Sequence, residues 1–144
     1  MLLSKEFAVF LNLAGCKLKQ YTALALKRSG VDLTPEQFLL VDLLWNHGSM
    51  SQQSLADMMK KDKNSITKLV DGLEKKQFVE RRRDASDRRS NIVVLTPRAN
   101  AMKNDTKEKG ISMLDDILRG VSEEELRVFL STLDKILGNM DENS

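Results

Sequence analysis

Residues 62–96, DKNSITKLVDGLEKKQFVERRRDASDRRSNIVVLT, decide the fold, because the spacing of their apolar residues changes partway along. Up to residue 76 the apolar residues recur every three or four positions, which is the period of an amphipathic helix. Two short runs follow, QFVERRR and NIVVLT, in which β-branched and aromatic residues favour strands. The turn-forming residues 84–87 lie between the two runs. The stretch therefore predicts a helix followed by a two-stranded hairpin with arginines at its tip.

A second short helix is predicted directly before this one. In SQQSLADMMK, Ser51 is a suitable N-cap, and Leu55, Ala56 and Met59 form an apolar face. Asp62 is a suitable N-cap for the helix that follows, where its negative charge is favourable. Two helices of this size joined by a tight turn predict a helix-turn-helix.

Two longer helices are predicted upstream of this pair. Apolar residues between 7 and 25 follow helical spacing and form one stripe. Thr34 and Gln37 then have the spacing of a capping box, which predicts the start of a second helix that ends at Gly48. Because the second helix is apolar on most sides, we expect it to be the buried central helix, with Trp45 in the core.

Two more helices are predicted after the hairpin. Pro97 suits the first position of a helix, which Gly120 ends and which we expect Gly110 to interrupt. Ser122 and Glu125 form a second capping box at the start of the last helix. We expect the tail beyond residue 138 to fray.

These elements predict a mostly α fold with a small β-hairpin wing. We expect a single domain over 1–144, with a winged helix-turn-helix core at 34–96 flanked by dimerisation helices at 1–30 and 98–138. The apolar stripes of the flanking helices are larger than this small core can cover. Exposed stripes of that size indicate a partner surface.

The positive charge of the chain is concentrated in one segment. The formal net charge is only +2, but residues 60–89 hold eleven Lys/Arg against six Asp/Glu, whereas the remainder is net negative. Uneven charge of this kind points to a polyanionic partner such as nucleic acid.

The polar face of the helix after Asp62 is predicted to read DNA. At 100° per residue its polar residues point away from the apolar face, and amides, hydroxyls and amines there can bond base edges in a major groove. The predicted groove-reading residues are Asn64, Ser65, Thr67 and Lys68. Backbone amides at helix N-termini also bind phosphates. The predicted phosphate contacts are Ser51, Gln52 and Lys63.

The arginines of the hairpin tip are predicted to enter a minor groove, where arginine is the favoured cation. We expect Arg88 to do so, with Arg83 or Arg89. Asp87 is expected to accept backbone N–H groups in the turn and to pair with Arg83 or Arg89, which would hold the other guanidinium groups outward. Asp84 is either a similar turn former or an exposed residue. A solvated charged loop remains the alternative for the whole run.

The residue inventory excludes several classes of protein. One cysteine, Cys16, rules out an internal disulfide and fits a reducing cytoplasm, and one histidine, His47, leaves no His/Cys metal cluster. The sequence has no phosphate-binding glycine loop, no metalloprotease motif and no run of about 20 apolar residues that would span a membrane. We therefore expect a cytoplasmic protein without a cofactor, a membrane partner or enzyme activity.

The segments SLADMM, SITKLVDGLEKKQFVER and RRRDASDRRSNIVVLTP resemble the third helix, fourth helix and wing of the MarR family of bacterial transcription regulators. The wing signature of that family, Asp-x-Arg followed six residues later by Leu-Thr, falls on Asp87, Arg89, Leu95 and Thr96. The resemblance implies an obligate homodimer with interdigitating terminal helices. It also implies a pseudo-palindromic operator in double-stranded DNA, with half-sites one helical turn, about 34–36 Å, apart. We expect a repressor that a small-molecule effector releases, although the sequence identifies no effector.

Two other functions stay open. A winged domain can serve protein assembly without binding DNA, or the chain can be a thiol-based redox sensor acting through Cys16. The hydroperoxide-sensing branch of the family has its reactive cysteine at the position of Phe7, and Cys16 lies more than two helical turns beyond it. We expect Cys16 to be a buried or half-buried helical residue.

Overall fold

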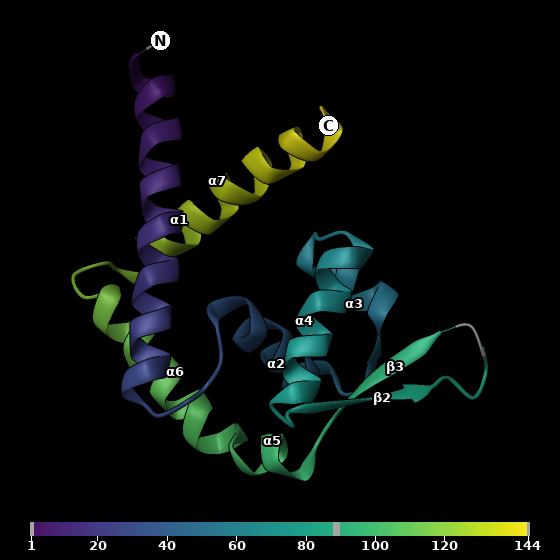
Figure 1. Ribbon diagram of the computed structural model, residues 1–144. Helices are drawn as coiled ribbons and strands as arrows, with labels where there is room; N and C mark the ends of the chain where they lie inside the picture. The colour runs from purple at the N-terminus through teal and green to yellow at the C-terminus, as the bar shows by residue number, and fades with distance from the viewer. Residues whose placement is uncertain (1, 88–89, 144) are drawn as a thin grey trace. The chain divides into compact units, whose positions relative to one another are not determined.

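The computed structural model of the protein describes residues 2–87 and 90–143. They form two compact units, Met1–Thr106 and Lys107–Ser144, and the boundary falls within one helix, α6. The elements, all but β1 labelled in Figure 1, are α1 (Leu2–Arg28), α2 (Pro35–His47), β1 (Met50–Ser51), α3 (Gln52–Met59), α4 (Lys63–Lys75), β2 (Val79–Arg83), β3 (Asn91–Leu95), α5 (Pro97–Ala101), α6 (Lys103–Ile117) and α7 (Glu123–Glu142).

The helix starts lie where local capping chemistry predicts them. Thr34 and Gln37 form the predicted capping box at α2, with each backbone N–H bonded to the other residue's side-chain oxygen. Ser122 and Glu125 do the same at α7. The hydroxyl oxygen of Ser51 accepts the Ser54 N–H at α3. Each cap satisfies backbone donors that the first turn of a helix leaves without partners.

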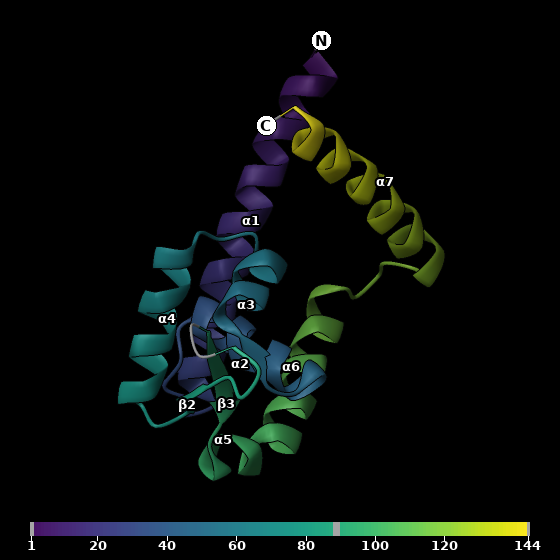
Figure 2. The same cartoon turned by 90° about the vertical axis from the view of Figure 1, so that its right-hand side faces the viewer.

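The core lies where α2, α3, α4 and the sheet meet, an arrangement that Figures 1 and 2 show from two sides. Leu44 of α2, Leu55 of α3 and Ile66 of α4 are fully buried and pack with Phe78 in one apolar cluster. Trp45 is also buried, as predicted, and its indole N–H donates to the carbonyl of Ala99 at 3.2 Å.

β2 and β3 form the predicted antiparallel hairpin, and a third strand that was not predicted, β1, joins them in the order β1-β3-β2. β1 pairs antiparallel with β3 through Met50↔Val93 and Ser51↔Ile92. Because β1 is only two residues long, it carries no alternating pattern that the sequence could reveal. Its pairing places β3 in the centre of the sheet.

The predicted interruption at Gly110 was wrong, because Gly110 lies inside α6. The chain breaks instead at Met102, between α5 and α6, where the Met102 N–H donates to the carbonyls of Ala99 and Asn100 in a tight turn. One glycine costs a helix about 1 kcal/mol, which the surrounding helix can tolerate. In the second unit α7 continues through Gly138 to Glu142, beyond the predicted fraying point.

The terminal helices expose their apolar residues. In α1 only Leu26 is buried, and Phe10 is 68% exposed. The N-terminal part of α1 extends beyond the other elements of its unit (Figure 1), so nothing in that unit covers it. Cys16 of α1 is exposed too, so the expectation of a buried or half-buried cysteine was wrong for the single chain. None of the helices in the described ranges has the length and apolar character needed to cross a membrane.

Candidate nucleic-acid interface

α3 and α4 form a helix-turn-helix within the first unit. The turn begins at Lys60, whose left-handed backbone (φ 54°) reverses the chain, and the Lys61 N–H donates to the Ala56 carbonyl at 3.1 Å. α4 then starts at its predicted N-cap, where the Asp62 carboxylate accepts the Ser65 N–H at 2.6 Å. This bond lowers the pKa of Asp62, since it favours the charged carboxylate.

One face of α4 is buried and the opposite face is open. Ile66, Val70 and Leu73 pack into the core, which leaves the polar side of the helix in solvent. Three of the predicted DNA contacts are exposed there, namely Lys63, Asn64 and Lys68. Ser65 is half-buried and its amide is used by the Asp62 cap.

Three other predicted DNA contacts are engaged within the protein. The Thr67 hydroxyl donates to the Lys63 carbonyl at 2.9 Å and accepts from the Gln52 amide at 3.3 Å. The Gln52 side-chain oxygen accepts from Arg81 at 2.8 Å. The Ser51 hydroxyl caps α3 and donates to the Ser54 hydroxyl at 2.9 Å. Their side chains therefore have less freedom to reach a base or a phosphate than the sequence suggested.

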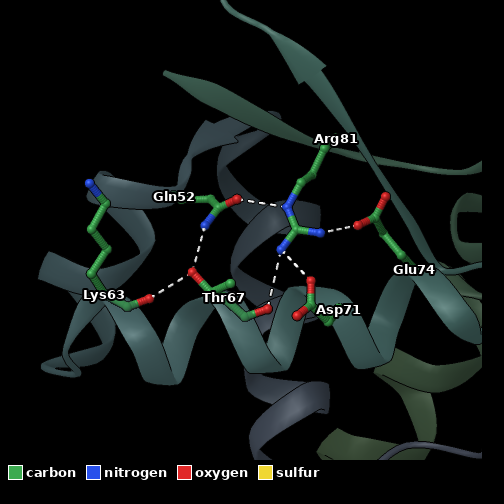
Figure 3. A network of polar contacts seen from close by, with 6 residues as sticks. All are labelled: Gln52, Lys63, Thr67, Asp71, Glu74 and Arg81. Carbon is green, nitrogen blue, oxygen red and sulfur yellow. Dashed lines mark hydrogen bonds and ion pairs between the residues drawn. The ribbon is translucent and has the colours of Figure 1, made fainter. Parts of the chain in front are cut away.

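Arg81 on β2 is the centre of a polar network that the sequence analysis missed (Figure 3). Its guanidinium donates to the Gln52 side chain at 2.8 Å, to the Thr67 carbonyl at 3.2 Å and to Asp71 at 2.8 Å, and it also pairs with Glu74. These partners lie on α3 and α4, so one side chain joins the wing to both helices.

A signal for this inward position was present in the alternation of the strand. Side chains two residues apart in a strand point to the same face. Val79 is buried, so Arg81 shares its face, whereas Arg82 points the other way and is exposed. Reading the arginine run as one charged cluster hid this difference.

Asp84 acts as a turn former at the tip of the wing, which is one of the two alternatives predicted for it. The Asp84 carboxylate accepts the backbone N–H of Ser86 at 2.9 Å and its hydroxyl at 2.8 Å. These bonds lower the pKa of Asp84, with the backbone bond the largest cause. The Asp87 carboxylate accepts the Ser90 hydroxyl at 3.3 Å.

The wing arginines that were predicted to contact DNA are only partly described. Arg83 is exposed at the end of β2. Arg88 and Arg89 lie outside the described residues, and so does any pairing of Asp87 with Arg89. Of these three arginines, Arg83 is the one that the structure describes, and it lies in the same compact unit as the exposed face of α4.

A cluster of surface ion pairs links α1 to the helix-turn-helix. Glu36 at the start of α2 lies 3.2 Å from the amine of Lys19 on α1 and 3.5 Å from that of Lys61 in the α3–α4 turn. The hydrogen bond from Lys19, followed by the charge of Lys61, lowers the pKa of Glu36. Over residues 2–87 and 90–143, no three His, Cys, Asp or Glu side chains are placed to hold a metal ion.

Comparison with known proteins gives consistent matches. A family model described as MarR family matches residues 33–91. The uncharacterized HTH-type transcriptional regulator YfiV of Bacillus subtilis is 35% identical over 112 residues, which cover 76% of this chain and 70% of that protein. The HTH-type transcriptional regulator MhqR of the same organism is 28% identical over 104 residues, 72% of each chain. A mutant MarR from E. coli complexed with operator DNA has the same fold, with a TM-score of 0.83 at 20% identity over 92% of this chain and 94% of that chain.

Proposed function

Because the chain belongs to the MarR family of transcription regulators, which are not enzymes, we propose that it represses transcription by binding a pseudo-palindromic operator as a homodimer. The observation that carries this proposal is the open polar face of α4, where Lys63, Asn64 and Lys68 are exposed beside a basic wing. A helix of this size fits a major groove, and a basic ribbon beside it can follow the adjacent backbone.

In this proposal α4 supplies the base contacts. Asn64 can bond adenine through two contacts, and Lys68 can reach guanine or a phosphate. Lys63 lies in the first turn of α4, where the helix dipole favours a phosphate. Ser65 is assigned to the major groove, through its hydroxyl, because its backbone N–H is bonded to Asp62. Thr67 lies beside them, although its hydroxyl is shared with Gln52. At α3 we assign the phosphate contact to Ser51 and Gln52, through the N-terminal amides of the helix.

The wing supplies the second set of DNA contacts. Arg83, Arg88 and Arg89 are assigned to the minor groove and its phosphates, because guanidinium groups keep their charge and fit phosphate oxygens. The turn that Asp84 closes supports this assignment, since a fixed tip loses less conformational freedom when it binds. Asp87 is assigned to the same turn.

The exposed apolar residues of the terminal helices support a homodimer. Each unit exposes large apolar side chains, on α1 in the first and on α7 in the second. We therefore assign 1–30 and 98–138 to dimerisation and 34–96 to DNA binding within one domain over 1–144. A two-fold dimer would place two copies of α4 about 34–36 Å apart, one turn of DNA. A chain with one cysteine suits a cytoplasmic regulator.

The proposal also includes a trigger that releases the protein from its operator. A small molecule that prefers one spacing of the two reading helices by a few kcal/mol would be sufficient to release the operator. A second candidate trigger is oxidation, and the exposure of Cys16 favours it. If Cys16 is the trigger, peroxide treatment should release the DNA from the wild-type protein but not from the Cys16→Ser variant.

The test is selection of duplexes by the purified protein from a random pool, followed by footprinting on the selected sequence at two salt concentrations. We expect a pseudo-palindrome, two protected half-sites and much weaker binding at the higher salt. Absence of binding to any duplex at low salt would contradict the proposal. It would favour the alternative in which the winged domain serves protein assembly, where Lys68→Ala and Arg88→Ala change nothing.

A further inference from the structure

An acidic residue lies on the proposed reading face of α4. Asp71 is three residues after Lys68 and four before Lys75, so all three side chains share one side of the helix. It is 54% exposed, and Glu74, one turn further on, is 37% exposed. Carboxylates in this position would repel the phosphates of a bound duplex.

Arg81 is placed to remove this repulsion. Its guanidinium contacts the carboxylates of both Asp71 and Glu74, and its other contacts go to the Gln52 side chain and the Thr67 carbonyl (Figure 3). The side chain is only 20% exposed, so its charge is directed into the protein. One cation thus compensates part of the negative charge of two neighbouring carboxylates.

We propose that Arg81 is a positioning residue for DNA binding, which holds Asp71 and Glu74 in ion pairs on the reading side of α4 and fixes the wing against α3 and α4. Arg81 itself does not contact the DNA. This inference rests on the proposed function and explains how a reading helix can carry carboxylates toward a polyanion.

The same strand offers a matched control. Arg82 is 66% exposed and points to the opposite face, where it pairs with Glu80 at 3.5 Å. Arg81→Gln and Arg82→Gln therefore change the net charge of the protein equally, but only the first leaves Asp71 and Glu74 without their cation.

The experiment measures the dissociation constant of the full-length protein for the duplex that the wild type selects from a random pool. We expect Arg81→Gln to weaken binding roughly tenfold, the size of one charge repulsion at a partly hydrated interface, and Arg82→Gln to weaken it less than about threefold. Circular dichroism and thermal unfolding check that each variant folds. If Arg81→Gln does not fold, Arg81→Met replaces it and Arg82→Met replaces its control, because both still remove one positive charge.

The decisive step is rescue by a second substitution. Adding Asp71→Asn to Arg81→Gln should recover at least about threefold of the lost affinity, whereas adding Glu80→Gln, which removes the same charge outside the network, should recover less than about twofold. Equal rescue by both, or rescue by neither, overturns the inference. Loss of sequence discrimination in Asp71→Asn alone also overturns it, because Asp71 would then read a cytosine. A wild-type protein that binds no duplex overturns the proposed function instead, and this inference with it.

Discussion

Replacing Lys68 with alanine tests the assignment of α4 as the reading helix. Lys68 is exposed on the open face of α4, and the substitution leaves the buried face of that helix intact. Alanine is also the best helix former, so the helix itself should not weaken. Any change in DNA binding should therefore come from the lost cation.

The size of the effect follows from counterion release. The five proposed cationic contacts per chain are Lys63, Lys68, Arg83, Arg88 and Arg89. A dimer would then neutralise about ten phosphates, and the logarithm of the binding constant should fall with that of the salt concentration at a slope of about −9. Removing Lys68 from both chains should reduce the slope to about −7, since each phosphate contact contributes about −0.9.

Fluorescence anisotropy of a labelled duplex, measured between about 50 and 200 mM salt, gives this slope directly. Over that range the wild-type protein should lose roughly 10⁵-fold in affinity and the variant roughly 10⁴-fold. Arg127→Ala on α7 is the control, since it removes a cation that pairs with Glu123 outside the candidate interface. An unchanged slope and an unchanged affinity in the Lys68 variant would show that α4 does not face the DNA.

Three further substitutions test other parts of the structure. Thr96→Val should lower the free energy of unfolding by about 2 kcal/mol in urea titrations, because it removes the N-cap of α5 and a part-buried hydrogen bond to the Gln77 carbonyl; an unchanged midpoint would contradict this. Glu36→Gln tests acid stability. Because Lys19 lowers the folded pKa of Glu36 below its usual value of 4.5, the pair stabilises the fold above that pH and the contribution is lost as the pH falls below it. The free energy of unfolding of the variant should therefore fall less than that of the wild type on acidification. The difference should be no more than about 1 kcal/mol, since the side chains of Lys19 and Glu36 are both exposed. Phe10→Glu places a charge in the exposed stripe of α1 and should convert the dimer to monomers in sedimentation experiments, whereas a purely monomeric wild type would refute the dimer.

The elements that the sequence predicted correctly are those that local chemistry determines. The caps at Thr34, Ser51 and Asp62 depend on side chains within three residues of the backbone groups that they satisfy, so their spacing is visible in the sequence. The α4 face could be predicted for the same reason, because the 3.6-residue period separates Ile66 and Val70 from the exposed positions.

The features that the sequence did not predict depend on partners far away in the chain. β1 exists only because it pairs with β3, and Met50 lies more than forty residues from Val93. Arg81 looks like one member of a charged cluster until the fold brings Asp71 and Glu74 to it. The exposure of Cys16 depends on whether another element packs against its part of α1, which no periodicity reveals.

The short strand β1 has a consequence for how this protein can vary. Ser51 is both the last residue of β1 and the N-cap of α3, so no spacer separates the sheet from the helix-turn-helix. An insertion at that junction would change the strand register and the direction of α3 together. None of the described residues of the loop between β2 and β3 caps a helix, so residues can be added or removed there to change the reach of the wing while α3 and α4 keep their places.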